Sequence, residues 1–280
     1  MSKSFGIELE VSGTTVRCSS ITPAIKRSWL AIKHKFEINC GNDHCGYEYR
    51  TPIMPSTPES ISKIQKFFEL MEKEVENNNL PKTRHLFHRN TGLHVHVDIT
   101  ELDIAARNNM FKIICLFEPN IYLCQPASRT NNSWCGSIRK ILKRSTRTLS
   151  EINTRDFSSF KGRSNILSRN WDDSGACLSD KYTTVEFRYG KATFCPEDVV
   201  NWVLLLLIIV ENAKHMQKDF QVPFTTKDNI RITAENQNAF AKFIRNADSS
   251  MFWLKRRRKA VARWVLKKIA ERKALDKMMR

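Results

Sequence analysis

Two histidines and an aspartate alternate with apolar residues in one short stretch of the sequence, Gly92-Leu93-His94-Val95-His96-Val97-Asp98. Side chains of a β-strand point alternately to its two faces, so the three polar groups would share one face and the leucine and valines the other. Neighbouring polar groups would then stand about 7 Å apart, which is two strand rises. Such a face can bind a metal ion, zinc included. The alternative is the solvent-facing side of an ordinary strand.

Three further short segments show the same alternation and place ionisable groups on one face. They are Phe5–Val11 with Glu8 and Glu10, Gly46–Ile53 with Glu48, and Thr183–Gly190 with Glu186 and Arg188. Four such faces on one sheet would form a concave polar surface, although each strand alone could be a solvent-facing edge strand. Carboxylates gathered there would repel one another unless cations neutralised them, and Mg²⁺ or Mn²⁺ would suit such ligands and leave positions open for phosphate oxygens. An arginine two residues from a glutamate ligand could stabilise the charge of a phosphoryl group in transfer.

The composition is that of a folded chain without a membrane span. The 280 residues are 41% hydrophobic, with nine Gly, nine Pro and eight dispersed Cys, which predicts one domain, or one domain plus an appendage, with reduced thiols. The longest apolar run, Trp202–Val210, is too short to cross a bilayer, and the first residues lack the apolar region of a secretory signal. We therefore expect a soluble, cytoplasmic protein. Cys40, His44 and Cys45 could form half of a zinc site, but no second pair of matching spacing follows, so a plain loop is preferred.

Helical periodicity predicts the elements that would support these strands. Helices are expected over 57–77, over 101–117 with Thr100 as N-cap and an interruption at Pro119, over 196–218, and from Asn236 onwards. A turn is expected at Gly41-Asn42-Asp43. The 57–77 segment has apolar residues at helical spacing throughout, so we expect it to pack in the core.

The positive charge of the chain is concentrated in its last thirty residues. Residues 251–280 contain twelve Lys and Arg against two acids, which accounts for +10 of the net +17. The run Lys255–Lys259, with Trp253 and Trp264 nearby, predicts a basic, aromatic-flanked helix. It is a candidate contact for nucleic acid or for another acidic partner, and a membrane-surface helix is a further alternative. A solvated helix face is the ordinary interpretation of such a run.

Taken together, the four alternating segments resemble the motifs of the putative amidoligase family. This family belongs to the carboxylate–amine ligase superfamily, with glutamine synthetase and glutamate–cysteine ligase. The motifs here are Gly6-Ile7-Glu8-Leu9-Glu10, Tyr47-Glu48-Tyr49-Arg50-Thr51-Pro52, Gly92-Leu93-His94-Val95-His96-Val97-Asp98 and Thr184-Val185-Glu186-Phe187-Arg188. Their order and spacing fit the family, they lie between about residue 5 and residue 210, and no motif position is visibly substituted.

The resemblance implies a role for each motif residue. The metal ligands would be five residues, Glu8, Glu10, Glu48, His94 and Glu186. His96 would lie near the ATP phosphates, and Arg188 would contact the γ-phosphate or an acyl-phosphate intermediate, so that Glu48, His96 and Arg188 would be the catalytic groups. Asp98 would have a supporting role. Substrate would be held by Arg129, Arg163 and Asn165 or Asn170, for which surface or capping roles are the alternative.

The resemblance also implies a fold and a reaction. The fold would be α+β, with a glutamine synthetase-like antiparallel sheet curved into a partial barrel or funnel and backed by helices. Residues 1–222 would form the catalytic domain and residues 223–280 a basic, mostly helical extension packed on or appended to it. The reaction would be an ATP- and Mg²⁺- or Mn²⁺-dependent ligation of a carboxylate and an amine through an acyl phosphate, with small molecules or peptides as substrates. The competing hypothesis is a nucleic-acid-binding protein that uses the C-terminal helix and keeps the ligase-like domain as a scaffold.

Overall fold

A computed structural model describes residues 3–12, 36–37, 39–43, 46–77, 91–130, 135, 137, 176–179, 183–216 and 234–279. The chain forms two compact units. The first comprises Met1–His96 and Gly190–Val203, and the second comprises Val97–Tyr189 and Leu204–Arg280. Three elements contribute residues to both units, namely β5 (Gly92–Asp98), β7 (Thr184–Lys191) and α6 (Pro196–His215). Each unit is described by itself.

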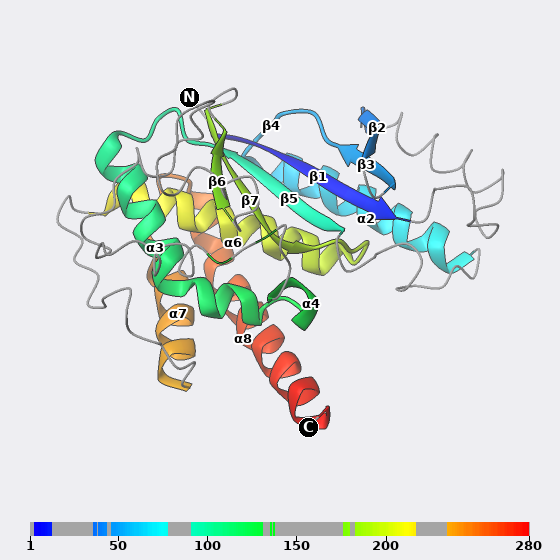
Figure 1. Ribbon diagram of the computed structural model, residues 1–280. Helices are drawn as coiled ribbons and strands as arrows, with labels where there is room; N and C mark the ends of the chain where they lie inside the picture. Colours follow the sequence, from blue (N-terminus) through cyan, green and yellow to red (C-terminus); the bar gives the residue numbers. More distant parts are fainter. Residues whose placement is uncertain are drawn as a thin grey trace, which may run out of the picture. The chain divides into compact units, whose positions relative to one another are not determined.

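The first unit contains an antiparallel sheet (Figure 1). Its strands are β1 (Ser4–Ser12), β2 (Asn39–Asp43), β3 (Gly46–Arg50), β4 (Met54–Pro55) and the first part of β5 (Gly92–Asp98). The hydrogen-bonded order is β2-β3-β1-β5, and β4 pairs with one end of β1. The predicted α+β class is confirmed, but the sheet is not curled or closed, so the expected partial barrel or funnel is not shown.

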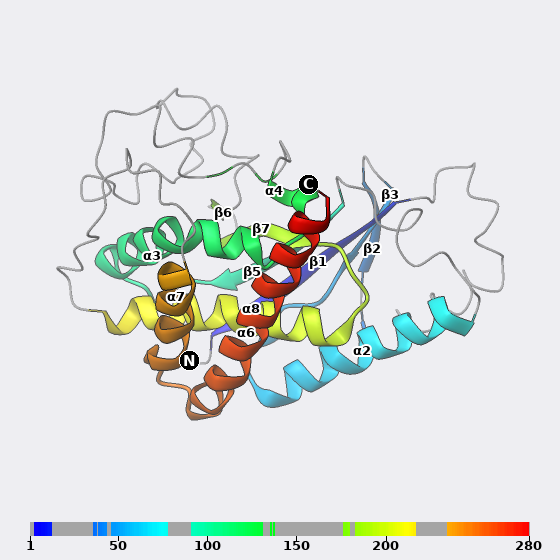
Figure 2. The ribbon, with the colours of Figure 1, turned by 90° about the horizontal axis from the view of Figure 1, so that it is seen from below.

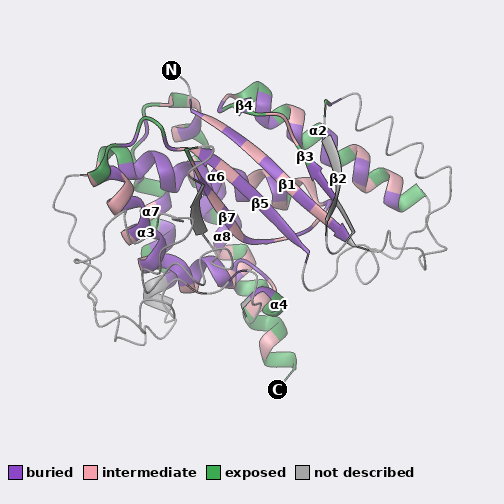
Figure 3. Ribbon diagram, turned by 45° about the horizontal axis from the view of Figure 1, so that its top comes forward, coloured by how far each residue is buried: buried purple, intermediate pink, exposed green. Residues whose placement is uncertain are grey.

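The predicted alternation along β1 is confirmed. Its four apolar side chains are buried, and those of Glu8 and Glu10 on the other face are partly exposed, as the alternating colours of Figure 3 show. Helix α2 (Pro58–Asn77) lies along one face of this sheet (Figure 2). Six apolar residues at helical spacing are buried on α2, namely Ile61, Ile64, Phe67, Phe68, Met71 and Val75. This confirms the predicted core helix.

Gly190 brings two segments of the first unit unusually close together. A Cβ atom at this position would lie 2.5 Å from the carbonyl oxygen of Leu93 and 2.9 Å from Nε1 of Trp202. Neither a strand carbonyl nor a buried indole can move aside cheaply, so only glycine fits there. Leu93 directly precedes His94, so this contact helps to position β5.

The second unit is mainly helical. It contains α3 (Ile104–Leu123), α4 (Ala127–Thr130), the rest of α6 (Pro196–His215), α7 (Ala234–Asn246) and α8 (Phe252–Met278), with the strand pair β6 (Ala176–Ser179) and β7 (Thr184–Lys191). Helices α7 and α8 lie side by side (Figure 2) and both contact α3. The ring of Phe117 on α3 lies 4.8 Å from that of Phe240 and 4.9 Å from that of Phe243, between centroids.

Two predicted boundaries are wrong for local reasons. Helix α3 begins at Ile104 with Asp103 as N-cap, whose side chain accepts a hydrogen bond from the amide of Ala106. Thr100 belongs instead to the turn after β5, where its amide and its hydroxyl both donate to the Asp98 carboxylate, the amide at 2.8 Å. The helix then continues through Pro119, since residues on both sides of the proline are buried and hold it in place although a backbone hydrogen bond is lost.

The turn expected at Gly41-Asn42-Asp43 is also wrong, because these residues belong to β2 and pair with β3. The helix expected from Asn236 onwards is divided into α7 and α8. Between them, the buried carboxylate of Glu211 on α6 accepts hydrogen bonds from the Ser249 hydroxyl and the Ser250 amide, at 3.0 and 3.2 Å. These bonds hold the connecting segment out of helical geometry. The division into domains 1–222 and 223–280 stays a prediction.

Helix α6 has the predicted start and character. It begins at Pro196, and its apolar residues from Trp202 to Val210 are all buried. Glu197 and Asp198 lie in its first turn and Lys214 and His215 in its last, where each charge is favourable to the helix dipole. Within the residues that the structure describes, no helix combines the length and the apolar character that crossing a bilayer requires.

Candidate active site

The register of β1 and β3 brings the first two motifs together. Glu8 lies opposite Arg50 and Glu10 lies opposite Glu48 in this antiparallel pair. Directly opposed residues present their side chains on the same face, so three carboxylates and a guanidinium share the face that is not packed in the core. The neighbouring Ile7, Leu9, Val11 and Tyr49 are buried, and side chains alternate between the two faces of a strand, so the charged side chains point to the opposite face.

The two histidines of β5 lie on the same face as the β1 carboxylates. Nδ1 of His94 is 3.8 Å from a Glu8 oxygen, and Nε2 of His94 is 3.7 Å from a Glu10 oxygen. Nε2 of His96 is 3.5 Å from Glu8. His94 is only 4% exposed, whereas His96 is partly exposed. His94 is therefore enclosed between two carboxylates, while His96 stands nearer to solvent, where a ligand can reach it.

Glu10 is fixed by the backbone of the neighbouring strand. Its carboxylate accepts a hydrogen bond of 2.6 Å from the amide of Gly92, the first residue of β5. On the other side of β1, the amide of Ile7 donates to the hydroxyl of Thr51, at 2.9 Å. These bonds set the positions of the strands around Glu8, and they hold Glu10 in one orientation.

Arg50 is a member of the site that the sequence interpretation left without a role. Its guanidinium forms an ion pair with Glu48 and lies 3.8 Å from a Glu8 oxygen. It therefore offsets part of the negative charge of the cluster. The signal was available in the sequence, because Glu48 and Arg50 are two residues apart on one strand and must share a face.

The carboxyl groups of the cluster have divergent pKa values. Burial tends to raise the pKa of Glu8, but hydrogen bonds and charge from His94 and His96 outweigh it and hold that pKa well below its usual range. Burial, together with the charge of Glu8 and a hydrogen bond to it, raises the pKa of Glu48 to about 7, against the opposing effect of Arg50. Like charges this close cannot both ionise freely, so Glu48 holds its proton up to about neutral pH while Glu8 is ionised.

Three of these side chains are arranged as metal ligands. One donor atom from each of Glu8, Glu48 and His94 lies within 4.8 Å of the other two. Two carboxylate oxygens and one imidazole nitrogen make a donor set that suits Mn²⁺ and, with water ligands, Mg²⁺. Glu10 is close to His94 but is held by Gly92.

The fourth motif lies on β7, in the second unit, and is described by its own contacts. The predicted alternation is confirmed: Val185, Phe187 and Tyr189 are buried, and Glu186 and Arg188 on the other face are partly exposed. Nε of Arg188 lies 3.6 Å from a Glu186 oxygen. This distance makes the two side chains an ion pair along one strand.

Arg129, a predicted substrate residue, is buried behind β7. It is 1% exposed, and its guanidinium donates a hydrogen bond to the main-chain carbonyl of Arg188. The carboxylate of Glu118 is also buried, and it accepts a hydrogen bond from the Tyr189 hydroxyl at 2.8 Å. These contacts support the strand that carries Glu186 and Arg188. A direct role of Arg129 in holding substrate stays a prediction.

The remaining predicted residues lie apart from these contacts. Arg163, Asn165 and Asn170, like His44 and Cys45, are outside the residues that the structure describes. Asp98 accepts hydrogen bonds from the amide and hydroxyl of Thr100 at the end of β5. It therefore shapes the turn that follows the strand, and its supporting role at the site stays a prediction.

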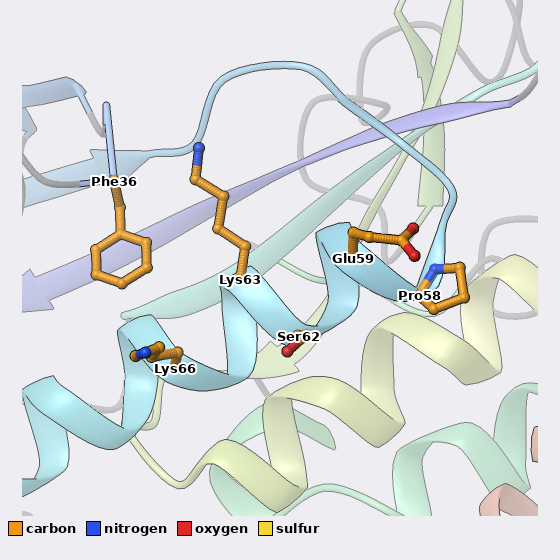
Figure 4. Close-up of a pocket in the computed structure, with 6 residues that line it drawn as sticks. All are labelled: Phe36, Pro58, Glu59, Ser62, Lys63 and Lys66. Atoms are coloured by element: carbon orange, nitrogen blue, oxygen red, sulfur yellow. The ribbon is translucent and has the colours of Figure 1, made fainter.

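A pocket of about 570 Å³ lies elsewhere in the first unit (Figure 4). It is lined by Phe36 and by residues of α2, namely Pro58, Glu59, Ser62, Lys63 and Lys66. Beside it, Nζ of Lys63 forms an ion pair of 3.2 Å with Glu37. None of the charged residues of β1, β3 and β5 lines this pocket, so its location gives no reason to place chemistry there.

Comparison with known proteins identifies the family. No curated protein matches the chain. A family model described as "putative amidoligase enzyme" matches residues 27–210, about two thirds of the chain. The matched range contains Glu48, His94, His96, Glu186 and Arg188, whereas β1 precedes it. Glu8 and Glu10 therefore join the site through their distances to the histidines. The chain belongs to the putative amidoligase family.

Proposed function

We propose that the protein is an ATP-dependent ligase that joins a carboxylate to an amine through an acyl-phosphate intermediate. The observation that supports this most directly is the cluster of Glu8, Glu48 and His94, whose donor atoms lie within 4.8 Å of one another in a chain of the amidoligase family. ATP and Mg²⁺ are abundant in the cytoplasm, and we propose that compartment as its place of action.

The donor set fits a divalent cation. Glu8, Glu48 and His94 would hold it, with Glu10 adjacent and, as the family resemblance implies, Glu186 as a further ligand. A bound Mg²⁺ or Mn²⁺ would offset the charge of the ATP phosphates and hold them in a fixed orientation. The proton that Glu48 retains near pH 7 would leave when the cation enters.

Two bond exchanges make up the proposed reaction. In the first, a carboxylate oxygen of the substrate attacks the γ-phosphorus of ATP, the bond from that phosphorus to the β–γ bridging oxygen breaks, and ADP leaves. In the second, the amine nitrogen attacks the acyl carbon, the carbon–oxygen bond to phosphate breaks, and the nitrogen loses a proton. Both steps bring anions or electron-rich atoms together, so positioning and charge stabilisation supply most of the catalysis.

The residues of the chain have distinct tasks in this proposal. Arg188 would contact the transferring phosphoryl group, and His96, the more exposed histidine, would donate a hydrogen bond to a phosphate oxygen. Arg50 would neutralise Glu48 and Glu8 until the cation binds. Arg129 would keep Arg188 in place through its hydrogen bond to the main chain.

A substrate screen tests the proposal. Pairs of carboxylates and amines, from glutamate-like acids to peptides, would be incubated with ATP and Mg²⁺, with ADP release as the first readout and the mass of an amide product as the second. Glu8→Gln and Glu186→Gln should abolish product formation. Glu69→Gln, which changes an exposed carboxylate on α2, is the matched control and should leave it intact. ADP release without an amide product, or turnover that survives both site variants, would overturn the proposal.

A further inference from the structure

Helix α8 carries two groups of cations with different surroundings. One group is engaged with the rest of the second unit: Lys255 pairs with Asp248 at 2.8 Å, Arg258 donates to the carbonyl of Ala247, and Arg272 donates to the carbonyl of Gln125 at 2.8 Å. These residues hold the helix to its neighbours. Their charge is therefore explained by the fold.

The second group forms a row on the outer face of the helix, interrupted between Lys267 and Lys277, which we name the α8 stripe. Its members are exposed and are Arg256, Lys259, Arg263, Lys267 and Lys277. At 100° per residue they fall within an arc of about 80°, and at 1.5 Å per residue they extend over about 30 Å. Among the described residues, no carboxylate lies within ion-pair distance of Lys259, Arg263 or Lys277. Lys259 and Arg263 are four residues apart, and like charges at this spacing destabilise a helix, so helix stability gives no reason for these two cations. Lys277 lies in the last turn, where its charge is favourable to the helix dipole.

An exposed aromatic ring lies at the N-terminal end of the stripe. Phe252 is 68% exposed and falls on the same arc, and the guanidinium of Arg256 lies over its ring, 4.6 Å from the centroid. A phenylalanine ring beside a row of cations is the combination that binds single-stranded nucleic acid, in which phosphates contact the cations and a base stacks on the ring.

The position of the helix argues against a membrane-surface role. An interfacial helix inserts its apolar face into the lipid headgroups. On α8 that face is already buried in the protein, through Leu254, Val261, Trp264, Val265 and Ile269. Between the cations of the stripe, the arc presents only Ala270 and Ala274. The stripe itself thus offers positive charge and one aromatic ring. The other exposed large apolar side chains, Leu275, Met278 and Met279, lie outside its arc at the C-terminal end of the helix.

We propose that the α8 stripe is a binding surface for the backbone of single-stranded nucleic acid, with Phe252 as a stacking platform for one base. This binding would be additional to the ligase activity and independent of it. Each phosphate contact to a single strand contributes about −0.7 to the slope of the logarithm of the association constant against the logarithm of the salt concentration. Five such contacts therefore predict a slope of about −3.5.

Fluorescence anisotropy of labelled oligonucleotides with the full chain tests this inference. The variant Lys259→Gln/Arg263→Gln/Lys277→Gln removes three stripe cations and should reduce the salt slope by about 2 and the affinity at low salt at least tenfold. The charge-matched control is Lys66→Gln/Lys73→Gln/Lys242→Gln, which changes exposed lysines of α2 and α7. It should bind as the unchanged chain does, and thermal unfolding of both variants verifies that they fold.

Further arms identify the ligand. Comparing DNA and RNA strands of the same sequence shows which of the two nucleic acids the protein binds more tightly. Phe252→Leu keeps an apolar side chain but removes the ring, so it should weaken binding of single strands about tenfold and binding of duplexes little. Equal binding by the stripe variant and its control would overturn the proposal. So would stripe-dependent binding to anionic phospholipid vesicles, or to an acidic polypeptide, without binding to oligonucleotides.

Discussion

Glu10 on β1 lies directly opposite Glu48 on β3, so the register of two neighbouring strands pairs two carboxylates. Like charges in this position destabilise a sheet by about 0.2–1 kcal/mol, and Glu48 is also buried. Arg50 offsets part of this charge. A bound cation would relieve the repulsion that remains.

The first prediction concerns the replacement of Glu48. In metal-free protein at pH 8, Glu48→Gln should increase the free energy of unfolding by about 1 kcal/mol, because it removes a buried charge beside Glu8 and Glu10. With Mn²⁺ at a hundredfold excess over its Kd, the unchanged protein should gain about 2.7 kcal/mol, and Glu48→Gln should gain little. Urea denaturation with EDTA or with MnCl₂ measures both quantities. Equal stabilisation by Mn²⁺ in Glu48→Gln and in the Glu69→Gln control would exclude Glu48 as a ligand.

The second prediction separates the two histidines. His94 is enclosed between Glu8 and Glu10, whereas His96 is partly exposed. His94→Gln should therefore remove the Mn²⁺-dependent increase in the unfolding midpoint. His96→Gln should keep that increase but lower ATP turnover at least tenfold, since its proposed partner is a phosphate. Thermal unfolding with and without MnCl₂, followed by an ADP-release assay, makes the comparison. If His96→Gln also removes the response to Mn²⁺, the two histidines do not have separate roles.

The third prediction concerns the close approach at Gly190. Gly190→Ala should lower the free energy of unfolding by about 1–3 kcal/mol, because the added methyl group would meet the Leu93 carbonyl and the Trp202 indole. It should also weaken Mn²⁺ binding, since Leu93 precedes His94. Gly6→Ala is the matched control: its Cβ would lie 3.9 Å from the Thr51 hydroxyl, an ordinary contact, so its stability should stay within about 0.5 kcal/mol of the original. Urea denaturation of the two variants tests the difference.

The sequence predicts some parts of this site well because those parts depend on local pattern alone. A period of two places Glu8 and Glu10, His94 and His96, and Glu186 and Arg188 on one face of their strands. Burial confirms this for all of them but His94, which is itself buried and is placed on the shared face by its distances to Glu8 and Glu10. The amidoligase motifs then indicate which chemistry the faces serve.

Other features depend on contacts that a pattern does not contain. The pairing of Glu8 with Arg50 follows from the register of strands that are about forty residues apart, and neither sequence segment specifies that register. The start of α3 coincides with two side-chain contacts, since Thr100 donates to Asp98 in the preceding turn and Asp103 caps the helix by accepting from the Ala106 amide. The burial of Arg129 behind β7 is likewise a tertiary contact, whereas its residue type alone suggests the surface.

The fourth prediction concerns alkaline pH and the polar core behind β7. Burial raises the pKa of Tyr189, and the nearby Glu118 raises it further. Burial likewise raises the pKa of Tyr122, whose hydroxyl donates to the carbonyl of Cys135. A pKa that is higher in the folded than in the unfolded protein gives stability that is fully present below the unfolded value, about 10, and is lost as the pH rises above it.

Each buried tyrosine should therefore lower the free energy of unfolding by about 1 kcal/mol between pH 10 and pH 11. Tyr122→Phe removes one of the two buried tyrosine hydroxyls. The loss of unfolding free energy that the two tyrosines cause between pH 10 and pH 11 should therefore be about half as large in this variant, whatever its stability at pH 8. Urea denaturation at pH 8, 10 and 11 measures the slope, and ultraviolet absorbance at the tyrosinate band follows ionisation directly. Tyr47→Phe serves as the comparison, because Tyr47 belongs to β3 and not to α3 or β7, which carry Tyr122 and Tyr189. A slope that is the same in Tyr122→Phe as in the unchanged protein would show that Tyr122 ionises alike in the folded and unfolded chains.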